Sequence, residues 1–316
     1  MLDPAVALAA DVRLYPLHAD LSPDLEKLDQ VLATCKKPVK ALLATHFFGL
    51  AQDFTDLKEW CDKHDVVLIE DCSHVLFTDG FQAAGTGLFG RFVAASPYKF
   101  FPCADGGLLY SSAEQLLIGV KTEAAGLLQE LRGIKRTWEQ CRPAGAMTYE
   151  TGAIDKLLES FSKHPVTAAA EEITQYAQPS ALFSAGAART ASLRSARFIV
   201  SRSSIEENIR RRRNNYRQWL AAAAGLPNCH PLFPDLPDAC APYMFPLHIE
   251  HPTPHFYWLK HLGVPIWRWD EMAISDCPVA QDYRLHLLHL PCHQSLTEKQ
   301  MNWLTIALQK TLHHPA

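Results

Sequence analysis

The sequence predicts an α/β protein with a large domain, built on a mainly parallel sheet flanked by helices, and a smaller α/β domain at the C-terminus. Short apolar runs alternate with stretches of helical length between residues 11 and 110, without hairpin turns between them. This alternation is typical of βαβ units on a parallel sheet. The chain has 316 residues, which suits one large and one small domain. We expect the large domain over 1–195 and the small one over 196–316.

Each expected element follows from its local pattern. Strands are expected at 11–16, 39–45, 66–69, 92–95, 107–110, 243–249 and 264–269, where apolar runs are bounded by polar or turn residues. Apolar periodicity predicts helices at 21–37, 53–64, 203–224 and 253–262, and a last helix after Thr297. Ser22 and Pro23 suit the start of the first helix, and Thr297 with Gln300 matches a capping box. Residues 112–195 are largely helical and alanine-rich, without motifs.

Composition limits the partners and the compartment. With 48% hydrophobic and 20% charged residues, the chain has the composition of a soluble globular protein. A formal net charge of −4 gives no reason to expect nucleic acid or an anionic membrane as a partner. Nine scattered cysteines favour a reducing compartment with free thiols. No signal peptide and no apolar segment of membrane-spanning length is indicated, so we expect a cytoplasmic protein.

Two apolar runs end in chemically active residues. Residues 66–69 lead to Asp71, and residues 92–95 lead to Ser96 and Lys99. Ligands of open α/β sheets gather beyond the carboxyl ends of the strands, so Asp71 and Lys99 are expected to face one crevice. Apolar neighbours disfavour the ammonium form of Lys99, which makes a lysine nucleophilic enough to form a Schiff base. Asp71 can bind Mg²⁺, act as a base, hold a protonated pyridine nitrogen, or only cap the following turn.

Together, Asp71 and Lys99 favour a site for pyridoxal 5′-phosphate, because enzymes that use this cofactor need a carboxylate to hold its ring nitrogen protonated. Ser96 can donate a hydrogen bond to the phosphate. His74, expected in the first turn of a short helix, either lines the same cleft or is structural. His46, at the end of its strand, has the same two interpretations.

Other patterns do not indicate a separate site. Three cysteine–histidine pairs resemble metal ligands: Cys61 with His64, Cys72 with His74, and Cys292 with His293. None is matched by a second pair at zinc-finger spacing, so we expect no metal. The arginine run at 210–213 lies in an amphipathic helix and is interpreted as a solvated face. The serines lack a G-x-S-x-G context, which gives a serine hydrolase no support.

The motifs resemble the DegT/DnrJ/EryC1/StrS family of pyridoxal phosphate-dependent aminotransferases, which have the aspartate-aminotransferase-like fold (fold type I). The matching segments, in chain order, are His46-Phe47-Phe48-Gly49, Ile69-Glu70-Asp71-Cys72-Ser73-His74, Gly87 and Gly90 before a strand, Ser96, Lys99, Asp105-Gly106-Gly107, and Leu290-Pro291-Cys292-His293 with Leu296-Thr297-Glu298. The resemblance is strongest in residues 38–111 and weak from about 115 to 200.

The resemblance implies a role for each candidate residue. Lys99 would hold the cofactor as a Schiff base and move protons between the substrate and the cofactor, and Asp71 would pair with the pyridine nitrogen. His74 would lie near the ring oxygen and Ser96 at the phosphate. The family usually transfers an amino group, often from glutamate, to a keto sugar carried on a nucleotide, at the interface of a homodimer.

The sequence also departs from the family pattern. Family members generally begin well before the position that matches Met1, with a loop and helix that bind the cofactor phosphate, so we expect an N-terminally truncated large domain. Residues 186–203 do not match the family's Asn-x-Arg segment, which leaves the nucleotide-sugar substrate open. The alternatives to an aminotransferase are an impaired family member that acts as a binding or regulatory protein, and a pyridoxal phosphate-dependent lyase or dehydratase. Dehydratases that carry histidine in place of the lysine are disfavoured by Lys99.

Overall fold

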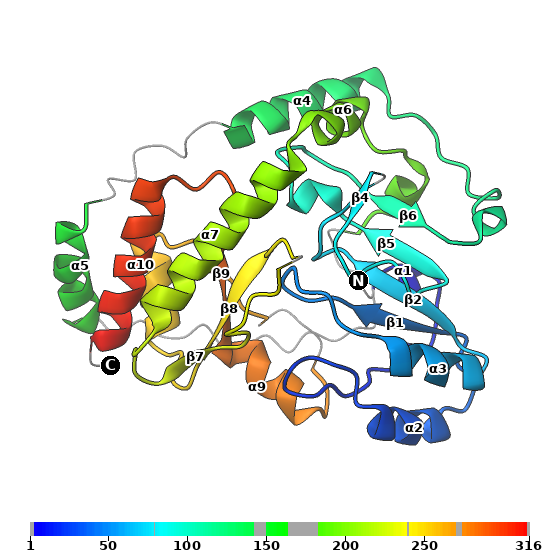
Figure 1. Cartoon of the computed structure of the whole chain (residues 1–316), viewed down its shortest axis with the longest axis horizontal. Coiled ribbons are helices and arrows are strands. Elements are labelled where there is room, and N and C mark those ends of the chain that lie inside the picture. The colour runs from blue at the N-terminus through cyan, green and yellow to red at the C-terminus, as the bar shows by residue number, and fades with distance from the viewer. Residues whose placement is uncertain are drawn as a thin grey trace. The chain divides into compact units, whose positions relative to one another are not determined.

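The computed structural model describes residues 3–78, 80–141, 150–163, 183–238, 240–269 and 274–314. The chain forms two compact units, one of Met1–Pro143 with Gln175–Ile205 and one of Ala144–Thr174 with Glu206–Ala316. Each unit has its own sheet (Figure 1) and its own apolar core. The chain enters the second unit twice, whereas the sequence predicts a single boundary between residues 195 and 196.

The first unit is organised around a sheet with the strand order β1-β2-β5-β6. Strands β1 (Ala41–Thr45), β2 (Val67–Cys72) and β5 (Phe92–Ala95) run parallel, and β6 (Leu108–Tyr110) pairs antiparallel with β5. In this register Thr45 lies beside Asp71, and Asp71 lies beside Ala94. The mainly parallel sheet confirms the predicted fold class.

Helices α2 (Leu25–Thr34) and α3 (Thr55–Lys63) pack on this sheet. Their apolar sides form one core with inward-facing residues of β1 and β2 and the residue before β2: Leu28, Leu42, Ala44, Phe54, Leu57, Trp60, Cys61, Val66 and Leu68. Every second residue of β1 is buried, because successive side chains of a strand point to opposite faces. The other elements of this unit are α1 (Asp3–Ala7), β3 (Phe77–Thr78), β4 (Phe81–Gln82), η1 (Pro97–Lys99), η2 (Glu114–Leu116), α4 (Leu127–Cys141), η3 (Ala185–Arg189) and α6 (Arg194–Arg202).

Two expectations near the N-terminus are wrong. Residues 11–16 do not form a strand: the carbonyl of Pro16 accepts the N–H of Asp24 at 3.1 Å, and the hydroxyl of Tyr15 donates a hydrogen bond to the carbonyl of Leu43 at 3.0 Å. The first long helix begins at Leu25 and not at Pro23, because Ser22 and Pro23 belong to the preceding turn. Asp24 is its N-cap and accepts a hydrogen bond from the N–H of Lys27 at 3.1 Å.

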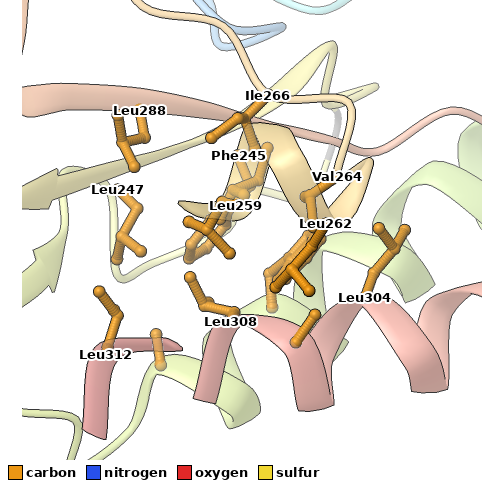
Figure 2. Close-up of a cluster of buried hydrophobic side chains, with 14 of the residues drawn as sticks. Phe245, Leu247, Leu259, Leu262, Val264, Ile266, Leu288, Leu304, Leu308 and Leu312 are labelled. Carbon is orange, nitrogen blue, oxygen red and sulfur yellow. The ribbon is translucent and has the colours of Figure 1, made fainter. Parts of the chain in front are cut away.

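The second unit contains the antiparallel sheet β7-β8-β9, formed by Cys229–Pro231, Met244–Ile249 and Leu287–Pro291. Its helices are α5 (Gly152–Lys163), α7 (Ile205–Ala223), α8 (His255–Leu262), α9 (Pro278–His286) and α10 (Glu298–His313). Figure 2 shows how Phe245 and Leu247 of β8 meet Leu259 of α8 and Leu308 of α10 in the core. The predicted strand 264–269 is wrong: within this segment only Trp267 forms a bridge, with His289.

The ends of two helices agree with the sequence patterns. In α10 the Thr297 side chain accepts from the N–H of Gln300 while the Gln300 side chain accepts from the N–H of Thr297, which confirms the capping box. Helix α8 ends at Gly263, whose φ of 88° is in the left-handed region that glycine adopts without strain. Among the described helices, none is long and apolar enough to cross a membrane.

Replacing Leu308 with alanine should destabilise the second unit by roughly 2–5 kcal/mol, because the side chain is 0% exposed and its loss leaves a cavity. Urea unfolding followed by tryptophan fluorescence measures this change. Leu157→Ala on α5 is the matched control, since Leu157 is 42% exposed. A Leu308→Ala protein that unfolds at the same urea concentration as the control would contradict the packing in Figure 2.

Candidate active site

Asp71 lies near the carboxyl end of β2 and is almost fully buried, at 1% exposure. Its Oδ1 accepts a hydrogen bond from the backbone N–H of Ser73 at 2.9 Å, and its Oδ2 accepts from the hydroxyl of Thr45 at 3.2 Å. Thr45 is the last residue of β1 and lies beside Asp71 in the parallel register. These two donors orient the carboxylate and leave each of its oxygens able to accept a further hydrogen bond.

Lys99 ends the short 3₁₀-helix η1, which follows β5 after Ser96. Pro97 at the start of η1 favours the turn, and the neighbouring Phe100 is fully buried. Burial lowers the pKa of the Lys99 ammonium below its ordinary value, and the negative charge of Asp71 opposes this by raising it. Asp71 near the end of β2 and Lys99 just after β5 thus lie at the carboxyl ends of adjacent parallel strands, where the charge of Asp71 acts on the pKa of Lys99.

Ser96 is joined to the same group of residues. Its hydroxyl donates a hydrogen bond to the hydroxyl of Ser73 at 3.2 Å, and Ser73 in turn donates its backbone N–H to Asp71. Thr45, Asp71, Ser73 and Ser96 thus form a continuous hydrogen-bonded chain across the carboxyl ends of β1, β2 and β5.

His74 lies three residues after Asp71, in a turn and not in the short helix that the sequence predicts. The N–H of Val75 bonds to the carbonyl of Cys72 at 3.3 Å, which closes a single turn that leads on to β3. The imidazole is half-buried, and its role toward a cofactor stays a prediction.

The ring of His46 is not brought together with Asp71 and Lys99. Its Nε2 bonds to Glu70 Oε1 at 2.8 Å, its Nδ1 accepts the N–H of Gln52 at 2.9 Å, and the ring stacks on Phe54 with centroids 4.7 Å apart. Because Glu70 and Asp71 are consecutive in β2, their side chains point to opposite faces of the sheet. Both nitrogens of His46 are therefore occupied in the interior on the face away from Asp71.

His46, Glu70 and Cys72 each offer one potential metal ligand, and these ligand atoms lie within 4.8 Å of one another. Glu70 also accepts hydrogen bonds from the backbone N–H groups of Gly87, Phe89 and Gly90. Burial, and then the charge of Glu70, raise the pKa of the Cys72 thiol well above its ordinary value, so the thiol stays protonated. N–H and S–H donors surround this carboxylate, so the cluster is better described as a hydrogen-bonded core than as a metal site.

Thr45 and Ser73, which hold Asp71 in place, are not among the predicted site residues. The available signal for Thr45 was a hydroxyl residue at the end of the strand before Asp71, since neighbouring parallel strands bring their carboxyl ends to one edge. Ser73 holds Asp71 through its backbone N–H, which every residue except proline has, so the identity of its side chain gave no signal for that contact.

A model of the DegT/DnrJ/EryC1/StrS aminotransferase family matches residues 5–229, which include every residue of this site. The chain belongs to the DegT/DnrJ/EryC1/StrS aminotransferase family. The resemblance drawn from the sequence motifs is therefore confirmed.

Two named family relatives are similar over part of the chain. The L-glutamine:2-deoxy-scyllo-inosose aminotransferase of Streptomyces kanamyceticus is 31% identical over 149 residues, which make up 45% of this chain and 33% of that enzyme. The GDP-perosamine synthase of Vibrio cholerae is 30% identical over 95 residues, 28% of this chain and 25% of that protein. The aligned stretches therefore span a third or less of the relatives' own length.

Solved structures of family aminotransferases share the fold over nearly the whole chain. Helicobacter pylori PseC, an aminotransferase involved in the biosynthesis of pseudoaminic acid, has a TM-score of 0.62 at 15% identity. The match covers 97% of this chain and 75% of PseC. A DegT DnrJ EryC1 StrS aminotransferase from Brucella abortus has a TM-score of 0.59 at 17% identity, with 76% of it covered by 99% of this chain. These similarities confirm the predicted fold type I.

In this family member, Lys99 should be acetylated by acetic anhydride at a lower pH than a solvated lysine, because burial lowers its pKa. Asp71→Asn should lower the pH of half-maximal labelling further, since it removes the charge that raises the pKa of Lys99. Mass spectrometry of the Lys99 peptide measures the rate at each pH, with the exposed Lys40 as internal reference. An unchanged or higher midpoint in Asp71→Asn would contradict the electrostatic pairing.

Proposed function

We propose that this protein is a pyridoxal 5′-phosphate-dependent aminotransferase in which Lys99 holds the cofactor and Asp71 binds its pyridine nitrogen. The observation that supports this most directly is the combination of a half-buried lysine of lowered pKa with a buried, oriented carboxylate whose charge acts on that pKa. They lie at the carboxyl ends of adjacent parallel strands, the sheet edge where open α/β folds bind ligands. Family membership supports the reaction class.

The residues of the site fit this cofactor. Its aldehyde reacts with a neutral amine, and the lowered pKa of Lys99 makes the neutral form more available. Its protonated pyridine nitrogen needs a hydrogen-bond acceptor, and Asp71 keeps that capacity beside its bonds to Thr45 and Ser73. We propose Ser96 as a contact to the phosphate and His74 as a contact near the ring.

When bound, pyridoxal phosphate supplies an electron sink for negative charge at the α-carbon of an amino acid. The protein's own residues would supply the proton transfers and the orientation. Nζ of Lys99 would accept the proton of the substrate α-carbon and would later donate it back to the bound substrate or cofactor. Thr45 and Ser73 would keep Asp71 in place, so that its charge is already oriented before the reaction.

We propose glutamate as the amino donor, with glutamine as the second donor to test, and a keto sugar or a related small carbonyl compound as the acceptor. Of the similar proteins, one is named for L-glutamine and 2-deoxy-scyllo-inosose and the other for GDP-perosamine. Family resemblance also favours a cytoplasmic homodimer, whose mass in solution can be measured by light scattering.

Incubation with pyridoxal phosphate should give an absorption band near the visible edge, and borohydride reduction should leave a permanent adduct on the Lys99 peptide. Lys99→Ala should remove both signals and lower amino transfer by roughly 10²–10⁴-fold, the usual effect of losing a general acid–base group. Lys121→Ala is the matched control, because Lys121 is exposed.

Addition of glutamate or glutamine should then convert the bound cofactor to its amine form and shift the band. A cofactor band that persists in Lys99→Ala would overturn the assignment of the lysine. A wild-type band that no amino donor shifts would favour a binding or regulatory protein, and turnover of one substrate without an amino acceptor would favour a lyase or dehydratase.

A further inference from the structure

Strand β2 contains a second buried carboxylate that the proposed chemistry does not use. Glu70 is 0% exposed and precedes Asp71, so its side chain is directed to the opposite face of the sheet. A buried carboxylate is costly in free energy unless hydrogen bonds compensate for the lost water. The partners of Glu70 therefore show what this carboxylate holds together.

On one side, Glu70 binds the residue that follows β1. The N–H of Gln52 donates to His46 Nδ1 at 2.9 Å, so this nitrogen has no proton and the ring N–H is on Nε2. Nε2 then donates to Glu70 Oε1 at 2.8 Å, within an interior where both side chains are 0% exposed. His46 is thus held as a hydrogen-bond donor to Glu70. The Glu70 carboxylate must be ionised to accept the hydrogen bonds of all its partners.

On the other side, Glu70 binds the segment that leads into β5. Oε2 accepts the N–H groups of Phe89 at 3.0 Å and Gly90 at 2.9 Å, and Oε1 also accepts the N–H of Gly87. Burial acts to raise the pKa of Glu70, but the hydrogen bonds from His46 and from this segment lower it more, so the pKa lies below its ordinary value. The carboxylate is therefore saturated, unlike that of Asp71.

The close approach of this segment depends on Gly90. A Cβ at Gly90 would lie 2.6 Å from the Cβ of Glu70 and 2.6 Å from the carbonyl oxygen of Phe92, much closer than atoms can pack. Phe92 is the first residue of β5 and lies beside Ile69 of β2. The fit between Glu70 and Gly90 thus determines where β5 begins relative to β2.

We infer that Glu70 is a positioning residue that sets the placement of Lys99 relative to Asp71. On one face of the sheet Glu70 attaches the start of β5 to β2, and beyond the other end of β5 the chain reaches Ser96 and Lys99. Asp71 is the next residue after Glu70. Strand β2 therefore holds both Glu70, which attaches the start of β5, and Asp71, whose charge acts on Lys99. The catalytic consequence rests on the proposed function, but the placement itself can be measured without cofactor.

Two variants perturb this attachment in different ways. Glu70→Gln replaces one oxygen with an NH₂ group that faces backbone N–H donors, and Gly90→Ala keeps the carboxylate but forces the segment away from it. Glu59→Gln on α3 is the matched control, because Glu59 is exposed. Circular dichroism and thermal unfolding of each sample establish which variants are folded at the assay temperature.

In the cofactor-free protein, Lys99 of both Glu70→Gln and Gly90→Ala should be acetylated about threefold faster at a fixed pH below its midpoint, because the Asp71 charge that raises the pKa of Lys99 then lies farther away. The Glu59→Gln protein should label like wild type. In an Asp71→Asn background, Glu70→Gln should give no further acceleration, because the charge through which it acts is gone.

The inference is wrong if folded Gly90→Ala and Glu70→Gln label Lys99 like the control. It is also wrong if Glu70→Gln accelerates labelling equally with and without the Asp71 carboxylate, since that result would indicate greater access of the reagent alone. If Glu70→Gln does not fold, Gly90→Ala alone and combined with Asp71→Asn gives the same comparison. A failure of Lys99 to bind pyridoxal phosphate would overturn the proposed function and leave these labelling results unaffected.

Discussion

The parallel pairing of β2 with β1 on one side and β5 on the other is the constraint on which the candidate site depends. It places Thr45 beside Asp71 and brings the turn that contains Ser96 and Lys99 to the same edge of the sheet. Because side chains alternate along a strand, a shift of β2 by one residue would exchange the faces of Glu70 and Asp71. Two adjacent carboxylates make such a shift expensive, since each one is matched to a different set of donors.

The two carboxylates show how similar side chains acquire different roles. Glu70 accepts hydrogen bonds from a ring N–H and from several backbone N–H groups, and both of its oxygens are occupied. Asp71 accepts from Ser73 and Thr45 only once at each oxygen, among the hydrogen bonds described. Saturation makes Glu70 a rigid attachment within the interior, whereas the remaining capacity of Asp71 suits it to a ligand.

The sequence was sufficient for the main features of this arrangement. The apolar runs before Asp71 and Ser96 are strands, and they run parallel in one sheet with Asp71 and Lys99 at their carboxyl ends. The wrong strand predictions, 11–16 and 264–269, fall on apolar segments that form no ladder, because the apolar character of a run does not show whether a neighbouring strand is available to pair with it. The direction of His46 could not be predicted, because a histidine at the end of a strand can turn to either face, and the choice depends on Glu70 and Gln52 through tertiary hydrogen bonds.

The second unit draws part of its core from a distant stretch of the chain. Helix α5 contributes the buried Ile154 and Leu158 to the same cluster as α8 and α10, although the rest of that unit begins at Glu206. A recombinant fragment that begins at Glu206 would lack this helix and would expose to water the apolar surface on which α5 packs. The residues from Glu206 onward therefore cannot be exchanged between relatives by themselves. A functional chimera would have to transfer α5 together with them.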